Sequence, residues 1–302
     1  MQLESLRTND IGATSVWMPS LGNGTEAMSH LTCLRFSELA FYYSLQQIEQ
    51  LEHSTVDFGP GNAVQSAVGM WFISIEAYIN SIIKIACLIK NSSFENIKTK
   101  DFGTRISILF NLLEIDPKPF YRSTFQKLEE FKRYRNELFH DRTNDSPMEF
   151  HRTLFSGNPM YANQVDVVQA CIISLETYHS FKHVIAGIDL TPQIVVHKNS
   201  SFFYAKIDTL YEEVLKPYFT STLEKHSLSS SLDLEISASM LEESPIFANK
   251  EIQIIVKALP SKHIDIRPSL KATSLGNELF EKLRNKVTFD TNLYFKVGDF
   301  YR

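Results

Sequence analysis

The feature that most constrains the fold is a stripe of apolar side chains through residues 62–90. These side chains recur every three or four positions, the spacing of one face of an α-helix. The stripe consists of Val64, Ala67, Val68, Trp71, Phe72, Ile75, Ile79, Ile82, Ile83, Ala86 and Ile89. Because so wide a stripe needs cover on several sides, we expect a helix at the centre of a bundle. Polar residues interrupt it (Ser74, Glu76, Asn80, Ser81 and Lys84), so we do not expect it to span a membrane.

Four further segments show helical spacing, over residues 26–52, 102–113, about 117–141 and 162–185. Asp116 and Pro117 supply an N-cap and a first-turn proline for the third of these helices. In the last helix we expect Val165, Val168, Ile172, Leu175 and Phe181 to point inward. Helices joined by short loops indicate a mainly α fold, an antiparallel bundle over residues 26–187. Residues 1–25 have no clear period and are expected to form an irregular N-terminal arm or a short strand.

The pattern changes near Gly187. Residues 191–197 indicate a short strand and residues 201–226 a helix, followed by β-like runs over 252–258 and 287–297. We therefore expect residues 188–302 to form a smaller C-terminal α+β domain, whose role the sequence does not indicate.

Charge and cysteine content restrict the function. The net charge of −5 argues against a generic nucleic-acid binder. Residues 118–142 nevertheless hold seven basic and four acidic residues, a local charge of +3, which is either a binding surface or an ordinary solvated helix face. The three cysteines, Cys33, Cys87 and Cys171, lie within apolar helical patterns and are expected to be buried thiols. No secretory signal is recognisable at the first residues, so we expect a cytoplasmic protein.

The most reactive segment is Arg135-Asn136-Glu137-Leu138-Phe139-His140. Arg135 falls near the middle of an apolar stripe formed by Phe125, Leu128, Phe131, Leu138 and Phe139. Because a guanidinium cannot lose its proton, burying it unpaired is costly. Arg135 must therefore meet an internal carboxylate such as Glu76 or Glu137, a subunit interface or a ligand phosphate.

The other two polar residues lie on one flank of the same helix. Asn136 and His140 are one helical turn apart, whereas Arg135 and His140 are ~140° apart around the axis, within reach of a long arginine side chain. His140 lies in the last turn, where exposed carbonyl groups favour imidazolium, so it can serve as an acid or a base. A cation, an amide and an imidazole together can cleave RNA without a metal.

This motif resembles that of the HEPN superfamily (higher eukaryotes and prokaryotes nucleotide-binding), in which an arginine and a polar residue precede a histidine on a bundle helix. Arg135, Asn136 and His140 match it in order and spacing. Residues 70–80, with Glu76 and Asn80 as polar positions, are similar to the second helix of that family. The resemblance covers about residues 26–187, and residues 188–302 have no counterpart.

The resemblance implies a metal-independent endoribonuclease, needing no cofactor, that works as a homodimer with a composite cleft. Arg135 would neutralise the scissile phosphate, His140 would act as base or acid, and Asn136 would orient them. The products would carry 2′,3′-cyclic phosphate ends. The side chains that would hold the motif residues in position are Glu76, Asn80 and Glu137. The side chains that would bind RNA are Lys132, Arg133 and Arg142. Such proteins in prokaryotes are often toxins or defence effectors, restrained by an antitoxin or another regulatory protein.

Two alternatives remain open. In a non-catalytic HEPN-like module for dimerisation and partner binding, Arg135 would pair with an internal carboxylate and His140 would be an ordinary surface residue. Separately, His179 and His183 have a spacing that can hold a metal. Because no zincin glutamate or cysteine cluster accompanies them, we expect a polar helix face and no metal site.

Overall fold

The structure is a computed structural model. It describes residues 14–18, 27–31, 36–37, 39–41, 43–44, 47, 61–90, 92–140, 147–184, 190–198, 201–228, 240–248 and 257–258. Helices dominate these residues, which confirms the mainly α fold.

The helices of the first part of the chain follow the apolar spacing closely. They are α2 (Gly61–Ile89), α3 (Glu95–Lys98), α4 (Phe102–Leu113), α5 (Lys118–Arg122), α6 (Thr124–His140), the 3-10 turn η1 (Pro159–Tyr161) and α7 (Gln164–Phe181), and the described positions between 36 and 47 are also helical. The helix expected over 117–141 is instead two helices, α5 and α6. The chain leaves helical geometry at Ser123, where φ is −113° and ψ is −84°.

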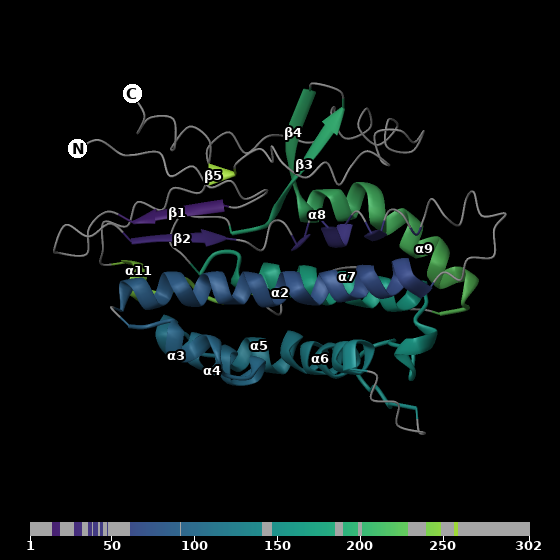
Figure 1. Cartoon of the computed structure of the whole chain (residues 1–302), viewed down its shortest axis with the longest axis horizontal. Helices are drawn as coiled ribbons and strands as arrows, with labels where there is room; N and C mark the ends of the chain where they lie inside the picture. Colours follow the sequence, from purple (N-terminus) through teal and green to yellow (C-terminus); the bar gives the residue numbers. More distant parts are fainter. Residues whose placement is uncertain are drawn as a thin grey trace.

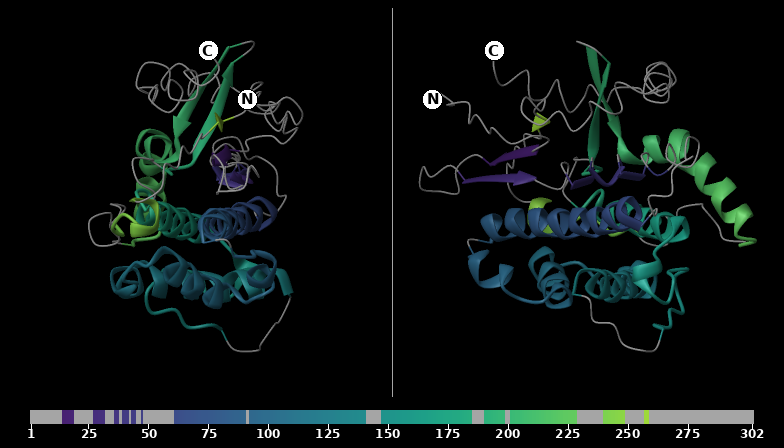
Figure 2. Two further views of the ribbon diagram at one scale, coloured as in Figure 1. Left: turned by 90° about the vertical axis from the view of Figure 1, so that its left-hand side faces the viewer. Right: turned by 45° about the vertical axis from the view of Figure 1, so that its right-hand side comes forward.

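The elements lie in layers, with α2 and α7 in the middle (Figure 1). Helices α3 to α6 cover one side of this pair, and the strands and later helices cover the other (Figure 2). Those later helices are α8 (Ile207–Leu210), a π-helical turn (Tyr211–Leu215) and α9 (Lys216–Lys225), whereas α11 (Pro245–Ala248) lies beside the middle layer (Figure 2). Because α7 is covered on both sides, every residue from Val165 to Phe181 is buried.

The expected antiparallel order is only partly correct. Ser174 Oγ donates to the carbonyl of Trp71, and Ser74 Oγ lies in hydrogen-bond contact with Tyr178 Oη. Residue numbers therefore rise together along α2 and α7, and these two helices run parallel. Helix α6 runs antiparallel to α7, because Lys127 contacts Glu176 and Thr124 contacts Ser180. The parallel pair arises because the chain returns through the layer of α3 to α6 before α7 begins.

Helix α2 is the central helix that its stripe predicts. By length and composition, its segment Val64–Lys84 could cross a membrane, but 67% of that window is buried inside the fold. Trp71 is completely buried, and its indole N–H donates to Ser44 Oγ at 3.0 Å. The apolar stripe therefore packs within the protein as a core helix.

Two of the expected helices begin later in the chain than their spacing predicts, because strands occupy their first residues. β1 (Thr14–Met18) pairs antiparallel with β2 (Ala27–Leu31), so the helix expected over 26–52 does not begin at residue 26. β3 (Gln193–Lys198) pairs with β4 (Ser201–Lys206), so the helix expected over 201–226 begins only at Ile207. In both places the partner strand offers backbone hydrogen bonds that outweigh a local helical period.

The short strand β5 (Lys257–Ala258) joins β1, which gives the sheet order β2-β1-β5. The arm expected over residues 1–25 therefore contains a strand, and a strand from the C-terminal part of the chain pairs with it. The β-like run over 287–297, the residue Arg142 and the cysteine Cys33 lie outside the described residues. Cys87 and Cys171 are free and buried, as expected.

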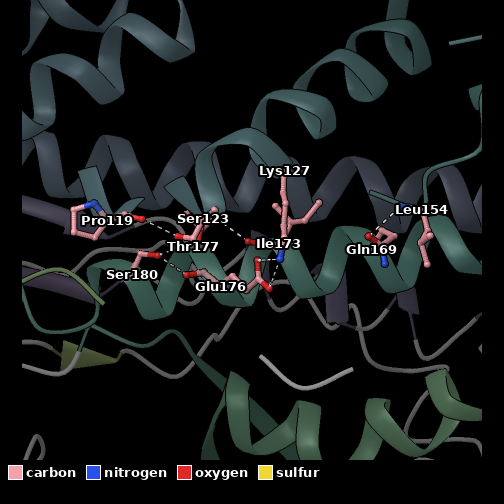
Figure 3. A network of polar contacts seen from close by, with 10 residues as sticks. Pro119, Ser123, Lys127, Leu154, Gln169, Ile173, Glu176, Thr177 and Ser180 are labelled. Atoms are coloured by element: carbon pink, nitrogen blue, oxygen red, sulfur yellow. Dashed lines mark hydrogen bonds and ion pairs between the residues drawn. The ribbon is translucent and has the colours of Figure 1, made fainter. Parts of the chain in front are cut away.

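Helices α6 and α7 are joined by polar groups as well as apolar ones (Figure 3). Lys127 Nζ lies 3.0 Å from Glu176 Oε1 and 3.2 Å from Oε2. The Glu176 side chain is only 2% exposed. Buried hydroxyl groups on α7 bond to carbonyls of the preceding turn, such as Thr177 Oγ1 to Ile173 O at 2.7 Å. Polar residues can therefore occupy a helix that is buried all round.

Replacing Lys127 with methionine is expected to destabilise the fold by about 2–4 kcal/mol, because the buried Glu176 carboxylate loses this cation. The free energy of unfolding from urea titration measures the effect. Lys98→Met is the matched control, because Lys98 pairs with Glu95 on the surface and should cost below ~1 kcal/mol. Equal losses in the two variants would show that the α6–α7 ion pair contributes nothing specific.

Candidate functional site

Helix α6 directs Arg135 toward α2, as its place on the apolar stripe predicts. The guanidinium lies over two aromatic rings, 5.1 Å from the centroid of Phe72 and 5.4 Å from that of Phe139. Phe72 is part of the core, whereas Phe139 is 51% exposed. Phe139, the last member of the stripe, is therefore only partly covered. Phe139 is ~80° around the axis from the buried Phe131, at the edge of the stripe.

The internal carboxylate that Arg135 meets is Glu76. Arg135 Nη2 lies 3.5 Å from Glu76 Oε2, so the expected pairing with Glu76 is confirmed. No ion pair or side-chain hydrogen bond joins Arg135 to Glu137 among the described residues. This ion pair is the arrangement expected of the non-catalytic alternative, so the position of Arg135 alone no longer argues for a ligand phosphate.

Glu76 is shared with a second arginine, Arg105 of α4. Arg105 Nη2 lies 2.8 Å from Glu76 Oε1, and Arg105 Nη1 donates to Asn80 Oδ1 at 2.7 Å. Two guanidinium groups thus face one carboxylate. The sequence analysis missed Arg105, although Arg105 interrupts the apolar face of α4 between Phe102 and Leu109, the same signal that singled out Arg135.

The three motif residues are only partly brought together. Arg135 Nη1 donates to Asn136 Oδ1 at 3.1 Å. His140 is exposed at the end of α6, and within the described part of the chain no side-chain hydrogen bond or ion pair joins it to Arg135 or Asn136. One protomer therefore presents a cation with its amide and, further along the helix, a separate imidazole.

A close approach between α2 and α6 supports the exposed end of the motif. A Cβ atom placed on Gly69 would lie 2.5 Å from Phe139 Cζ. The tip of the Phe139 ring thus points at the α2 backbone, and a side chain at position 69 would have to displace it. Gly69 thereby helps to hold the ring that covers the Arg135 guanidinium.

Two of the three expected RNA-binding residues, Lys132 and Arg133, lie on the same helix, and Arg142 is outside the described residues. Arg133 is exposed, and its guanidinium lies 5.6 Å from the centroid of the Phe150 ring. Lys132 is half-buried and pairs with Glu129 at 3.5 Å. Two further polar residues, His151 and Arg152, are exposed beside the helix, because the Glu130 carboxylate accepts both their backbone N–H groups at 2.9–3.1 Å.

A buried carboxylate, Asp166, fixes the start of α7 against the segment that follows α6. It accepts from the backbone N–H groups of Ser156 at 2.6 Å and Asn163 at 2.7 Å, and from Ser156 Oγ at 3.1 Å. Burial raises the pKa of Asp166, although these hydrogen bonds oppose the shift. Burial also raises the pKa of Tyr134, whose ring stacks on Phe155 with centroids 4.5 Å apart.

This raised pKa predicts a pH dependence of stability. Because the native pKa of Asp166 lies above the ordinary value of 3.8, its stabilising contribution is complete below that value and falls as pH rises through the native pKa. The difference in unfolding free energy between the wild type and Asp166→Asn should therefore shrink from acid toward neutral pH. Urea titrations at a series of pH values measure that difference.

Asp101 provides the opposite control. Hydrogen bonds from Thr104 lower the pKa of Asp101, so its contribution is present above the ordinary pKa and disappears as pH falls through the native one. The wild type minus Asp101→Asn difference should therefore shrink in acid. A wild type minus Asp166→Asn difference that grows with pH would contradict the assignment of a raised Asp166 pKa.

The two histidines at metal-binding spacing do not form a site. His179 is buried with its Nε2 3.9 Å from Asp208 Oδ2, whereas His183 is exposed beyond the end of α7. No group of three or more histidine, cysteine, aspartate or glutamate side chains able to hold a metal occurs among the described residues.

Comparison with known proteins adds no assignment: no family model, no curated protein and no solved structure matches this chain.

Proposed function

We propose that this protein is a HEPN-like, metal-independent endoribonuclease that acts as a homodimer. The observation that carries the proposal is the state of Arg135. Its guanidinium is 25% exposed and shares one carboxylate with Arg105, on a helix that also exposes His140. A loosely held cation and an accessible imidazole on one helix are suited to a phosphodiester.

Each side chain has a distinct role in the proposed reaction. A base removes the proton of the ribose 2′-OH, the 2′ oxygen forms a bond to phosphorus, and the bond from phosphorus to the 5′ oxygen breaks. Arg135 neutralises the charge on the phosphoryl oxygens, and Asn136 keeps the guanidinium oriented. His140 of one protomer takes the proton of the 2′-OH, and His140 of the other protomer donates a proton to the leaving 5′ oxygen.

The substrate class follows from the same chemistry. The 2′-OH is the nucleophile, so DNA is not cleaved. Arg133 is exposed on α6, and Arg152 and His151 are exposed beside it, where they contact the RNA backbone. As a cytoplasmic toxin or defence effector, such an enzyme requires restraint by an antitoxin or another regulatory protein.

One observation favours a second candidate, a non-catalytic module for dimerisation and partner binding. The ion pair between Arg135 and Glu76 satisfies the arginine within one protomer, and Phe139 offers an exposed apolar ring next to it. In that case the protein dimerises and recruits a partner through the motif helix but leaves RNA intact.

Incubation of the purified protein with mixed cellular RNAs in EDTA tests the proposal. The wild type is expected to cut RNA, to leave 2′,3′-cyclic phosphate ends and to spare DNA of the same sequence. His140→Ala is expected to reduce the rate by roughly 10²–10⁴-fold. Sedimentation should show a dimer for both proteins. A dimer that leaves every RNA intact in the presence of its cellular partners would establish the binding module instead.

A further inference from the structure

The shared carboxylate points to a role for Arg105, a residue outside the motif. We propose that Arg105 is a positioning residue that occupies Glu76 and so keeps Arg135 available to bind a phosphate group of the substrate. The inference rests on the proposed function and deepens it, because it identifies what sets the affinity of Arg135 for phosphate.

The two ion pairs of Glu76 are unequal. Arg105 approaches to 2.8 Å, has an 11% exposed side chain and donates a second hydrogen bond to Asn80. Arg135 approaches only to 3.5 Å and is 25% exposed. A shorter, more deeply buried and doubly hydrogen-bonded pair is the stronger one. Glu76 therefore compensates mainly the charge of Arg105, and the positive charge of Arg135 stays largely uncompensated.

Arg135 also keeps hydrogen-bonding capacity for a ligand. Its Nε is buried without a hydrogen-bond partner among the described residues, as is the Nε of Arg105. Within the described part of the chain its Nη1 bonds only to the neighbouring Asn136 amide, and its Nη2 makes the long contact to Glu76. A phosphate that binds the Arg135 guanidinium through two oxygens would replace the long contact of Nη2 to Glu76. It would also accept a hydrogen bond from Nε.

Loss of Arg105 would reverse this balance. Glu76 is a half-buried carboxylate, and without Arg105 the arginine left beside it among the described residues would be Arg135. The pair would shorten, because an uncompensated carboxylate in this position is costly. A phosphate would then have to compete with Glu76 for the same guanidinium, and its affinity would fall.

Titration of the protein with inorganic phosphate, followed by the ¹⁵N–¹H signals of the arginine Nε groups, tests the inference without any need for catalysis. In the wild type the Arg135 signal should shift saturably and the Arg105 signal should not. Arg105→Met should weaken phosphate binding about tenfold or more, equivalent to about 1.4 kcal/mol. The double variant Arg105→Met with Glu76→Gln should return to within about threefold of the wild type, since the competing charge is gone.

Matched variants separate this role from others. Arg122→Met removes an exposed arginine of α5 that is not an ion-pair partner of Glu76 in the described part of the chain, and it should leave the Arg135 titration nearly unchanged. Arg105→Lys keeps a cation beside Glu76, so its phosphate affinity should be close to that of the wild type. This variant tests the inference even if Arg105→Met fails to fold. Failure of Glu76→Gln to rescue Arg105→Met would overturn the inference, because Arg105 would then bind phosphate itself.

The same data distinguish the inference from the proposed function. If phosphate binds Arg135 with the expected dependence on Arg105 and RNA stays intact, the ribonuclease proposal fails while the role of Arg105 stands. If RNA is cleaved and Arg105→Met has the wild-type rate and phosphate affinity, the enzyme stands and the positioning role is wrong.

Discussion

Replacing Arg135 with alanine is expected to lower the rate of RNA cleavage by about 10³-fold or more, with little change in stability. The guanidinium is the one group in the motif that can neutralise the growing charge on the phosphoryl oxygens, and removal of such a donor costs this much in other phosphoryl-transfer and oxyanion sites. Stability should change little, because Glu76 keeps its closer partner Arg105. Single-turnover cleavage of a fluorescent RNA gives the rate, and thermal unfolding checks the fold.

Two variants make this prediction specific. Arg133→Ala removes an exposed arginine two positions earlier on α6, and it should weaken RNA binding by less than tenfold at low salt without a comparable loss of rate. Arg135→Lys keeps the charge but loses the two-pronged fork, so it should remain well below the wild type. A cleavage rate in Arg135→Ala close to that of Arg133→Ala would mean that any nuclease activity resides elsewhere.

The helices of the first part of the chain could be predicted because their apolar residues recur at helical spacing. The stripe from Val64 to Ile89 placed α2 at the centre, and α4 and α7 begin and end close to their apolar spacing. The break at Ser123 could not be predicted in this way, since the apolar spacing continues on both sides of it. Strands β2 and β4 were missed because each depends on a partner strand, which a local pattern does not reveal.

The candidate site illustrates the same limit. A charged residue within an apolar stripe indicated that Arg135 had a partner, and Glu76 was correctly named as one candidate. The sharing of Glu76 between α4 and α6 could not be predicted, because it depends on how these two helices pack against α2. The same rule applied to α4 would have singled out Arg105. His140 carried no comparable signal, since an exposed histidine at a helix end needs no partner.

Two phenylalanines on α6 should separate the stability of the fold from the chemistry of the site. Phe131 is fully buried, with its ring centroid 5.2 Å from those of both Phe72 and Phe155. Phe131→Ala should therefore cost about 3–5 kcal/mol of unfolding free energy, because it leaves a cavity between α2 and α6. Urea unfolding followed by circular dichroism measures this loss.

Phe139→Ala should give the opposite pattern. The ring is 51% exposed, so its removal should cost less than about 1 kcal/mol of stability. It lies 5.4 Å from the Arg135 guanidinium and helps to hold that group in place, so cleavage should still slow by roughly tenfold. A Phe139→Ala variant with unchanged stability and unchanged cleavage would show that Phe72 and Asn136 suffice to orient Arg135. A loss of stability as large as that of Phe131→Ala would instead mean that the ring is covered in solution, as a dimer formed through this face would require.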